Sequence, residues 1–209
     1  MDNSIAYKQL LKQINAVGSE KLNGYYPNTL EEIYDWERNK VEDIIWSAFC
    51  EKKEYNLAIF FPKLKNYDGL EKLKETLQKC QIPSESSVII AKVLYESTND
   101  DYYVEVIKRN IQKDPDNGVY VAMMSYAKPS KSLYNLLVEV YISSDNEIIR
   151  GSAVRGILYH KDFITNPYDF KKIIGMVNLR KIFDKSDRNE RKKVINNLEQ
   201  GMYEEYKKE

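Results

Sequence analysis

The side chains best suited to catalysis are scarce in this sequence. His160 is the only histidine, and Cys50 and Cys80 are the only cysteines. A Ser-His-Asp or Cys-His arrangement needs a histidine beside its nucleophile, and a structural zinc site needs about four His or Cys ligands. The two cysteines lie far from each other and from His160 in the sequence, so we interpret both thiols as packing residues. The sequence predicts no catalytic residue, no metal site and no cofactor.

A stripe of aromatic and acidic residues is the strongest candidate for a binding surface. Between Thr29 and Glu51 the apolar residues follow helical periodicity, and Thr29 and Glu32 have the spacing of a capping box. A second stripe on this expected helix follows spacings of 4, 3, 4 and 3 and consists of Glu32, Trp36, Asn39, Asp43 and Trp46. Two interpretations remain open, since the tryptophans either pack between neighbouring helices or bind a partner.

The elements that must hold these residues are expected to be helices. Charged residues make up 31% of the 209 residues, and the 8 glycines and 6 prolines are few for a sheet protein with many turns. Apolar periodicity, N-cap residues and turn residues delimit the segments. The expected helices cover residues 4–17, 29–51, 55–64, 68–80, 84–97, 99–113, 119–127, 130–143, 147–159, 166–177, 178–184 and a final segment from Asp187 to about Tyr206.

The charge balance and the start of the chain bear on partners and location. Lys plus Arg and Asp plus Glu both total 32, so no net field attracts DNA, RNA or an anionic membrane. The chain begins Met1-Asp2-Asn3, without the basic and apolar regions of a signal peptide. Apolar runs are far shorter than the roughly 20 residues that span a bilayer. We therefore expect a cytoplasmic protein with no membrane contact and no nucleic-acid partner.

Small and large apolar residues recur along the middle of the chain. Ala91, Ala122 and Ala153 are spaced by 31 residues, and each is followed four residues later by a large apolar or aromatic side chain. Such a period is typical of stacked helical pairs. The second helices of two successive pairs are expected to carry an exposed ridge that binds a partner, formed by Glu105, Arg109, Gln112, Asn135, Glu139 and Ile142.

The segment from Asp145 to Leu158 reads DNEIIRGSAVRGIL and resembles the first half of a HEAT repeat. The resemblance extends over residues 55–177, although the 31-residue interval is shorter than the ~40 residues usual for HEAT units. It implies an all-α fold, a right-handed α-α superhelix of about 10–12 helices. We expect one domain over residues 1–209, with N-terminal helices at 1–54, repeats at 55–177 and capping helices at 178–209.

The same resemblance bears on the basic residues. An arginine at the position of Arg150 or Arg155 in a HEAT unit forms hydrogen bonds within the stack. We therefore expect these arginines to bind Asp145 and not a phosphate group. The run 188–193 is interleaved with acidic residues, which indicates a solvated helix face. Neither GxxxxGK[ST] nor GxGxxG occurs, so we expect no nucleotide site.

Residues 25–38, YYPNTLEEIYDWER, resemble the N-terminal part of small bacterial proteins of unknown function, and the whole chain is similar in size and style to helical immunity proteins. This resemblance implies a protein-binding module rather than an enzyme, with a basic toxin domain as the partner. Two alternatives stay open. One is a HEAT-like DNA-binding or DNA-alkylation-repair enzyme, and the other is a structural scaffold.

Overall fold

The computed structural model describes residues 2–208 and all of their side chains except those at positions 19, 22, 23, 170 and 208. Within this range all regular structure is helical, without any strand. The α-helices are α1 (Ile5–Ile14), α2 (Thr29–Glu32), α3 (Arg38–Lys52), α4 (Gly69–Lys79), α5 (Glu85–Thr98), α6 (Tyr102–Lys113), α7 (Gly118–Ser125), α8 (Lys131–Ser143), α9 (Glu147–His160), α10 (Phe170–Gly175), α11 (Val177–Phe183) and α12 (Arg188–Glu199). Four 3-10 segments join them: η1 (Gly18–Asn23), η2 (Asp35–Glu37), η3 (Tyr55–Lys63) and η4 (Glu204–Lys208).

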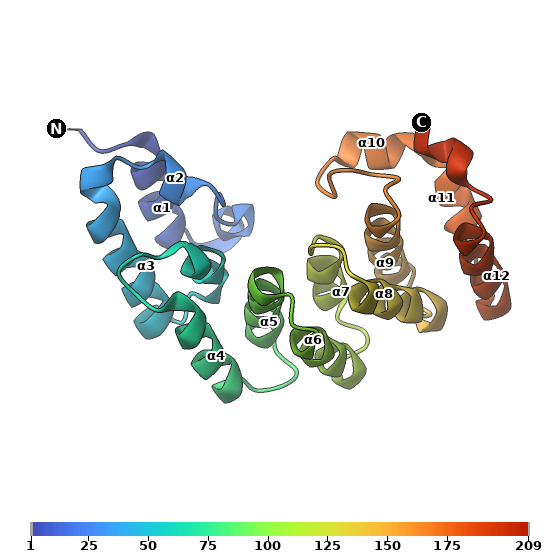
Figure 1. The fold of residues 1–209 in the computed structure, drawn as a ribbon, viewed down its shortest axis with the longest axis horizontal. Coiled ribbons are helices and arrows are strands. Elements are labelled where there is room, and N and C mark those ends of the chain that lie inside the picture. The colour runs from blue at the N-terminus through green and yellow to red at the C-terminus, as the bar shows by residue number, and fades with distance from the viewer. Residues whose placement is uncertain (1, 209) are drawn as a thin grey trace.

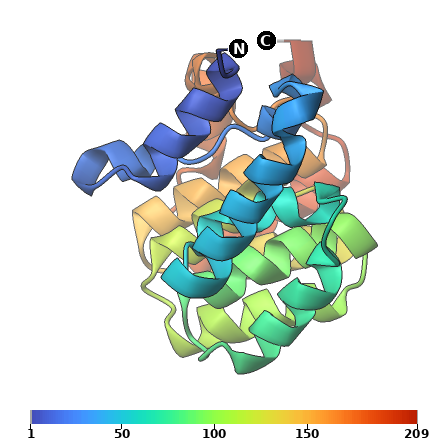
Figure 2. The same cartoon turned by 90° about the vertical axis from the view of Figure 1, so that its left-hand side faces the viewer.

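The helices are arranged as a curved stack (Figure 1). Helices α1 to α4 form one arm, α5 to α9 form the middle, and α10 to α12 form the other arm. The view from the N-terminal arm shows α1 and α3 lying across that end (Figure 2). Buried apolar side chains run through the whole length, from Tyr7 in α1 to Tyr203 beyond α12, as one continuous core.

Side-chain caps fix where many helices begin. The side chain of the residue before the helix accepts a backbone N–H that the first turn leaves unpaired. This contact occurs at α1, α4, α5, α7, α8, α9, α10 and α12, where the capping residues are Ser4, Asp68, Ser84, Asn117, Ser130, Asn146, Asp169 and Asp187. Asp68 and Asp187, which stand first in two of the segments expected from the sequence, are thus N-cap residues.

The middle of the chain follows the predicted segments closely. Helices α5 to α9 begin and end within three residues of the expected bounds. Ala91 and Ala153 are fully buried, but Ala122 in the shorter α7 is half-buried. Helix α9 packs on both α7 and α8, and the approach is closest at Gly156. A Cβ at that position would lie 2.7 Å from Leu137 Cδ1 and 3.0 Å from Ser125 Cα.

The prediction of one long helix over residues 29–51 is wrong. Helix α2 ends at Glu32, Ile33 and Tyr34 are extended with ψ of 156° and 148°, and η2 separates them from α3. The capping box predicted for Thr29 and Glu32 is also wrong, because the Thr29 hydroxyl instead donates to the carbonyl of Tyr26 at 2.6 Å. Glu32 and Trp36 therefore do not lie on the helix that carries Asn39, Asp43 and Trp46.

Three other segments differ from the prediction. Residues 55–63, which contain Pro62, form the 3-10 segment η3 rather than an α-helix. The helix expected over residues 166–177 is shorter, because α10 begins at Phe170 and ends at Gly175, whereas α11 lies within one residue of the helix expected over residues 178–184. The final helix ends at Glu199, so Tyr206 lies outside it in η4, and α12 packs against α8.

A buried ion pair holds the N-terminal arm together. Glu42 is 0% exposed and accepts hydrogen bonds from Arg38 Nε at 2.5 Å and from the backbone amide of Asn66 at 2.8 Å. The Lys65 amide also donates to this carboxylate. Burial alone would raise the pKa of Glu42, but these hydrogen bonds outweigh it and lower the pKa. Arg38 in turn donates to the carbonyls of Leu30 and Lys63.

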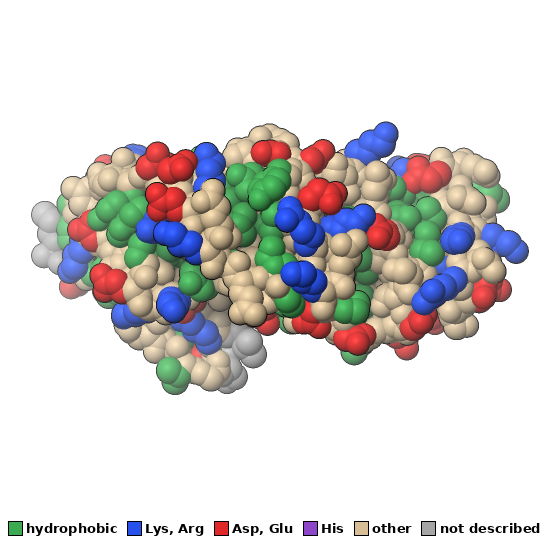
Figure 3. Space-filling model, turned by 90° about the horizontal axis from the view of Figure 1, so that it is seen from below, with side chains coloured by type: hydrophobic (Ala, Val, Ile, Leu, Met, Phe, Trp, Pro, Cys, Tyr) green, Lys and Arg blue, Asp and Glu red, His purple; other side chains and the backbone are tan. Residues whose placement is uncertain are grey.

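The surface carries no large region of one charge on the face seen from below. Acidic and basic side chains alternate there, with small hydrophobic patches between them (Figure 3). None of the described helices is both long and apolar enough to cross a bilayer.

Two glycines on α9 give a matched test of the packing between α7, α8 and α9. Gly156→Ala should destabilise the protein by about 1–3 kcal/mol, because its methyl group would collide with Leu137 and the backbone of Ser125. A Cβ at Gly151 would meet no atom within 4 Å, so Gly151→Ala should stabilise by about 0.5–1 kcal/mol through its helix propensity. Urea denaturation measures both. Equal effects at the two positions would contradict this packing.

Candidate protein-binding site

Tyr34 and Trp36 form an exposed aromatic pair on the N-terminal arm. Tyr34 is 51% exposed and Trp36 is 53% exposed. Their rings stack with centroids 6.1 Å apart and an interplanar angle of 29°. Glu32 and Asp35, which flank the pair, are exposed as well. A large apolar area therefore faces solvent beside two carboxylates, which is typical of a site that binds another protein.

The buried carboxylate of Glu37 holds this pair in place. One oxygen of Glu37 accepts the Ser4 amide at 2.8 Å, and the other accepts the Tyr34 amide at 3.0 Å. Burial alone would raise the pKa of Glu37, but hydrogen bonding to Ser4 and Tyr34 outweighs it and lowers the pKa. The segment that carries Tyr34 and Trp36 is thus tied to the first turn of α1. Its backbone is already in position before any partner binds, which reduces the entropy cost of binding.

Trp46 has a different environment from Trp36. Its half-buried ring stacks on Tyr67 at 4.3 Å and on Phe61 at 5.5 Å. The Tyr67 hydroxyl donates to Asp43 at 2.6 Å, and the Asn66 side-chain amide donates to Asn39 at 3.0 Å. These three residues of the predicted stripe therefore join α3 to the connection before α4. Of the two interpretations left open by the sequence, packing between helices applies to Trp46. Trp36 is exposed, so binding of a partner stays the interpretation for that residue.

The ridge expected on α6 and α8 has the predicted register. Five of its members are exposed, namely Glu105, Arg109, Gln112, Asn135 and Glu139. The sixth, Ile142, is half-buried against the core. Lys108 Nζ pairs with Glu139 across the two helices at 2.8 Å. Arg109 lies over the ring of the exposed Tyr102. The ridge is a polar surface, and its role in binding stays a prediction.

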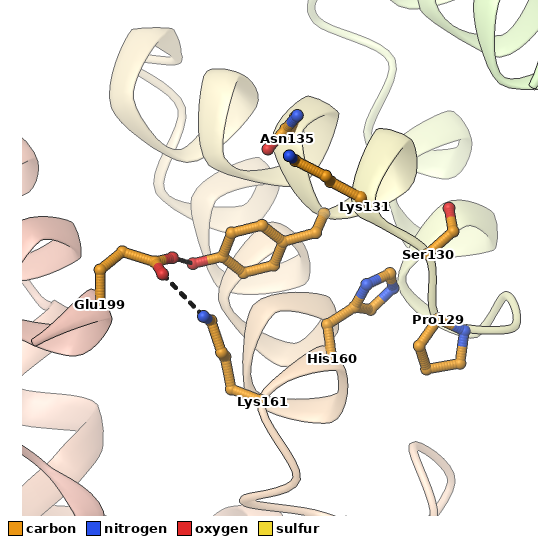
Figure 4. Close-up of a pocket in the computed structure, with 8 residues that line it drawn as sticks. Pro129, Ser130, Lys131, Asn135, His160, Lys161 and Glu199 are labelled. Atoms are coloured by element: carbon orange, nitrogen blue, oxygen red, sulfur yellow. Dashed lines mark hydrogen bonds and ion pairs between the residues drawn. The ribbon is translucent and has the colours of Figure 1, made fainter. Parts of the chain in front are cut away.

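A pocket between α8, α9 and α12 was not found from the sequence. Its volume is about 460 Å³, and it is lined by Pro129, Ser130, Lys131, Tyr134, Asn135, His160, Lys161 and Glu199. Figure 4 shows Lys161 reaching toward Glu199, with the His160 ring on the side of Ser130 and Pro129. Glu199 accepts hydrogen bonds from the Tyr134 hydroxyl and, at 2.8 Å, from Lys161. These contacts fasten α12 to α8 and α9.

The surroundings of the pocket shift the pKa values of His160 and Tyr134, which line it. Burial lowers the pKa of His160 to about 4, so the imidazole is neutral at pH 7. Its Nε2 is buried and has no hydrogen-bond partner in the described part of the chain. Burial, followed by the contact with Glu199, raises the pKa of Tyr134. The Ser130 hydroxyl accepts the Leu133 amide as the N-cap of α8, so Ser130 serves helix capping here.

The two cysteines are free thiols at two different helices. Cys50 is exposed on α3, and Cys80 is half-buried at the end of α4, where burial raises the pKa of its thiol. Within residues 2–208, no three His, Cys, Asp or Glu side chains are grouped so that they could hold a metal ion.

Neither a scan against protein-family models nor searches of curated proteins and of solved structures found a match. The interpretation of the sites therefore depends on their geometry. Among the surfaces described, the Tyr34–Trp36 pair combines exposed aromatic area, adjacent carboxylates and a fixed backbone.

The two tryptophans should respond differently to truncation. Trp46→Ala should destabilise the protein by about 2–3 kcal/mol, because it removes a ring packed on Phe61 and Tyr67. Trp36→Ala should change the free energy of unfolding by less than about 0.5 kcal/mol, because most of its ring faces solvent. Denaturant titration of the two variants provides the comparison. A large loss of stability with Trp36→Ala would assign that ring to the core.

His160 should make stability dependent on pH in the mildly acidic range. Its pKa is about 4 in the folded protein against 6.5 as the ordinary value. Between these values the unfolded chain binds a proton that the folded chain does not bind, so stability is full above about pH 6.5 and falls as the pH drops toward 4. The loss should reach about 1–2 kcal/mol once solvent screening is allowed for.

The measurement is the free energy of unfolding at pH 7.5 and at pH 5.0. His160→Gln is the matched control, because the chain then contains no histidine. The wild type should lose more stability between these two pH values than the variant. The same loss in both proteins would show that another group causes it.

Proposed function

We propose that this chain is a protein-binding scaffold, a HEAT-like right-handed helical superhelix that neutralises a basic toxin domain in the manner of an immunity protein. In this proposal the protein acts in the cytoplasm by covering its partner, and it has no catalytic role and no cofactor. The curved stack of helices supports the architectural part (Figure 1). Stacked helical units offer a broad surface for another macromolecule rather than a closed catalytic cleft.

The exposed Tyr34–Trp36 pair is the observation that carries the proposal. Exposed stacked aromatic rings on a fixed backbone lose little conformational freedom on binding, and tryptophan and tyrosine are enriched among residues that dominate interface energies. Because Glu37 fixes this segment through Ser4 and Tyr34, the pair is prepared to insert into a pocket of the partner.

The charges around the pair favour a basic partner. Glu32 and Asp35 are exposed and have no salt bridge in the described structure, while Glu31 pairs with Lys63 at 2.8 Å. Two carboxylates at the edge of an aromatic patch attract Lys or Arg side chains and speed association. Cationic side chains also bind favourably over the faces of Trp and Tyr.

The direct test measures binding to the protein encoded by the neighbouring open reading frame. We expect a basic protein that binds, with Trp36→Ala raising the dissociation rate about 30-fold, which corresponds to about 2 kcal/mol. Glu32→Gln combined with Asp35→Asn should instead slow association at low salt, because rim charges act mainly on the encounter. Surface plasmon resonance separates the two rates.

Tyr168→Ala is the matched control, because Tyr168 is an aromatic residue with 60% exposure before α10, away from the pair and from the ridge on α6 and α8. It should leave both rates unchanged. Equal losses with Trp36→Ala and Tyr168→Ala would contradict the assignment of the site. Retention on heparin at moderate salt would instead favour the DNA-binding alternative.

A further inference from the structure

A buried arginine at the other end of the molecule has unused donors. Arg191 on α12 is 0% exposed, and its Nη1 donates to the carbonyl of Ser144 at 2.8 Å. Its Nε and Nη2 make no hydrogen bond within the described structure. Buried guanidinium groups normally satisfy most of their five donors. Nε and Nη2 carry three of these five N–H groups, and the only anion near them in the described part of the chain is the Asp145 carboxylate, 3.5 Å from Nη2, so the unsatisfied donors point to an anion that would bind more closely.

Two more arginines converge on the same short connection between α8 and α9. Arg150 Nη1 donates to the carbonyl of Asp145 at 2.8 Å and, more weakly, to that of Ser144. Asp145 is thus a partner of Arg150, as expected from the sequence, but through its backbone. Arg188 Nη2 donates to the Asp145 carboxylate at 2.9 Å. Three guanidinium groups therefore surround one pair of residues.

Asp145 supplies the negative charge for this cluster. Among the described residues, it is the only carboxylate within 4.0 Å of any of the three guanidinium groups, at 2.9 Å from Arg188 and 3.5 Å from Arg191. The nearby carboxylate of Asp187 is used as the N-cap of α12, where it accepts two backbone amides. The three guanidinium groups carry three positive charges and the carboxylates of Asp145 and Asp187 carry two negative ones, so the excess is one positive charge, and it becomes two once the Asp145 carboxylate moves away.

The exposed position of Asp145 allows a ligand to take the place of its carboxylate beside the arginines. Its side chain is 77% exposed and lies on a connection of three residues, so a rotation about its side-chain bonds would carry the carboxylate into solvent. Nη2 of Arg191, which now faces this carboxylate, would then face the space that it leaves. The N-terminus of α9, which begins at Glu147, adds a partial positive charge at the same place.

We propose that Arg150, Arg188 and Arg191 form a binding site for a dianionic phosphate group, in which the Asp145 carboxylate is displaced by the ligand. A phosphate dianion matches the excess of two positive charges that remains beside Asp187 once Asp145 is displaced, and its several oxygens accept hydrogen bonds from more than one guanidinium. The group belongs either to a free phosphate or to a phosphorylated side chain, since both present the same oxygens. This site is independent of the Tyr34–Trp36 pair.

The test is a titration of the ¹⁵N-labelled full-length protein with inorganic phosphate at constant ionic strength, followed by NMR. Saturable shifts should appear at the amides of residues 144–150 and at the Nε of Arg191. Asp145→Asn, which removes the competing charge and keeps the side-chain size, should strengthen binding by about fivefold or more. Arg188→Gln should weaken it by a similar factor, and this exposed residue can be changed without opening the core.

Lys193→Gln is the matched control, because it removes one positive charge from an exposed position on the same helix. It should leave the affinity unchanged. A second titration with O-phosphoserine identifies the source of the group, since tighter binding than phosphate indicates a phosphorylated side chain and equal binding indicates a free phosphate. The absence of saturable shifts, or equal weakening by Lys193→Gln and Arg188→Gln, would overturn the proposal.

Discussion

The N-terminal arm depends on one buried ion pair, formed by Arg38 and Glu42. Arg38 reaches the carbonyls of Leu30 and Lys63, and Glu42 accepts the amides of Lys65 and Asn66. The pair thus joins α2, α3 and the connection after η3 through both side chains. Removing Arg38 would leave the fully buried Glu42 carboxylate with only the backbone amides of Lys65 and Asn66, at a cost below the ~3–5 kcal/mol typical of a buried charge that loses its partner. The segment from Ile33 to Glu37 is not α-helical, so its position relies on this ion pair and on Glu37.

These constraints explain how an exposed aromatic pair is kept in one conformation. Hydrophobic burial would draw Tyr34 and Trp36 toward the core if their segment were free to move. Glu37 prevents this by binding Ser4, the N-cap residue of α1. At the opposite arm, the pairing of Asp145 with arginines connects α12 to the start of α9 in a similar way. In both arms, carboxylates join elements that are distant in sequence, and the apolar core fills the space between them.

The sequence predicted the middle helices and α4 well but missed the break at residues 33–37 and the 3-10 segment at residues 55–63, for a physical reason. Among the middle helices, α5, α7, α8 and α9 begin at side-chain caps, and α6 has strong apolar periodicity, and both are local signals. The break at Ile33 interrupts a segment whose apolar spacing remains helical on both sides. It is fixed by contacts of Glu37 with Ser4, 33 residues away, and of Arg38 with Lys63, 25 residues away. Local periodicity contains no information about such contacts.

The candidate sites could likewise be predicted where local geometry fixes them, but not where contacts between distant residues fix them. The exposed positions of the ridge on α6 and α8 could be predicted because helical geometry alone fixes them. The difference between Trp36 and Trp46 could not, because it arises from the break before η2 and from the stacking of Trp46 on Tyr67. The pocket at Tyr134 and the cluster at Asp145 were also missed, since Tyr134 and Glu199 are 65 residues apart and Asp145 and Arg191 are 46 residues apart. Unused donors on a buried arginine can be recognised only in the folded structure.

The central claim is that Trp36 is exposed and yet held in place in the free protein. Time-resolved fluorescence anisotropy of Trp46→Phe, in which Trp36 is the only tryptophan, tests this most directly. The account predicts solvent-exposed emission whose anisotropy decays mainly with the tumbling of the whole molecule, and a fast additional decay when Glu37→Gln is introduced. A fast local decay in the protein with Glu37 intact, or emission typical of a buried indole, would contradict it.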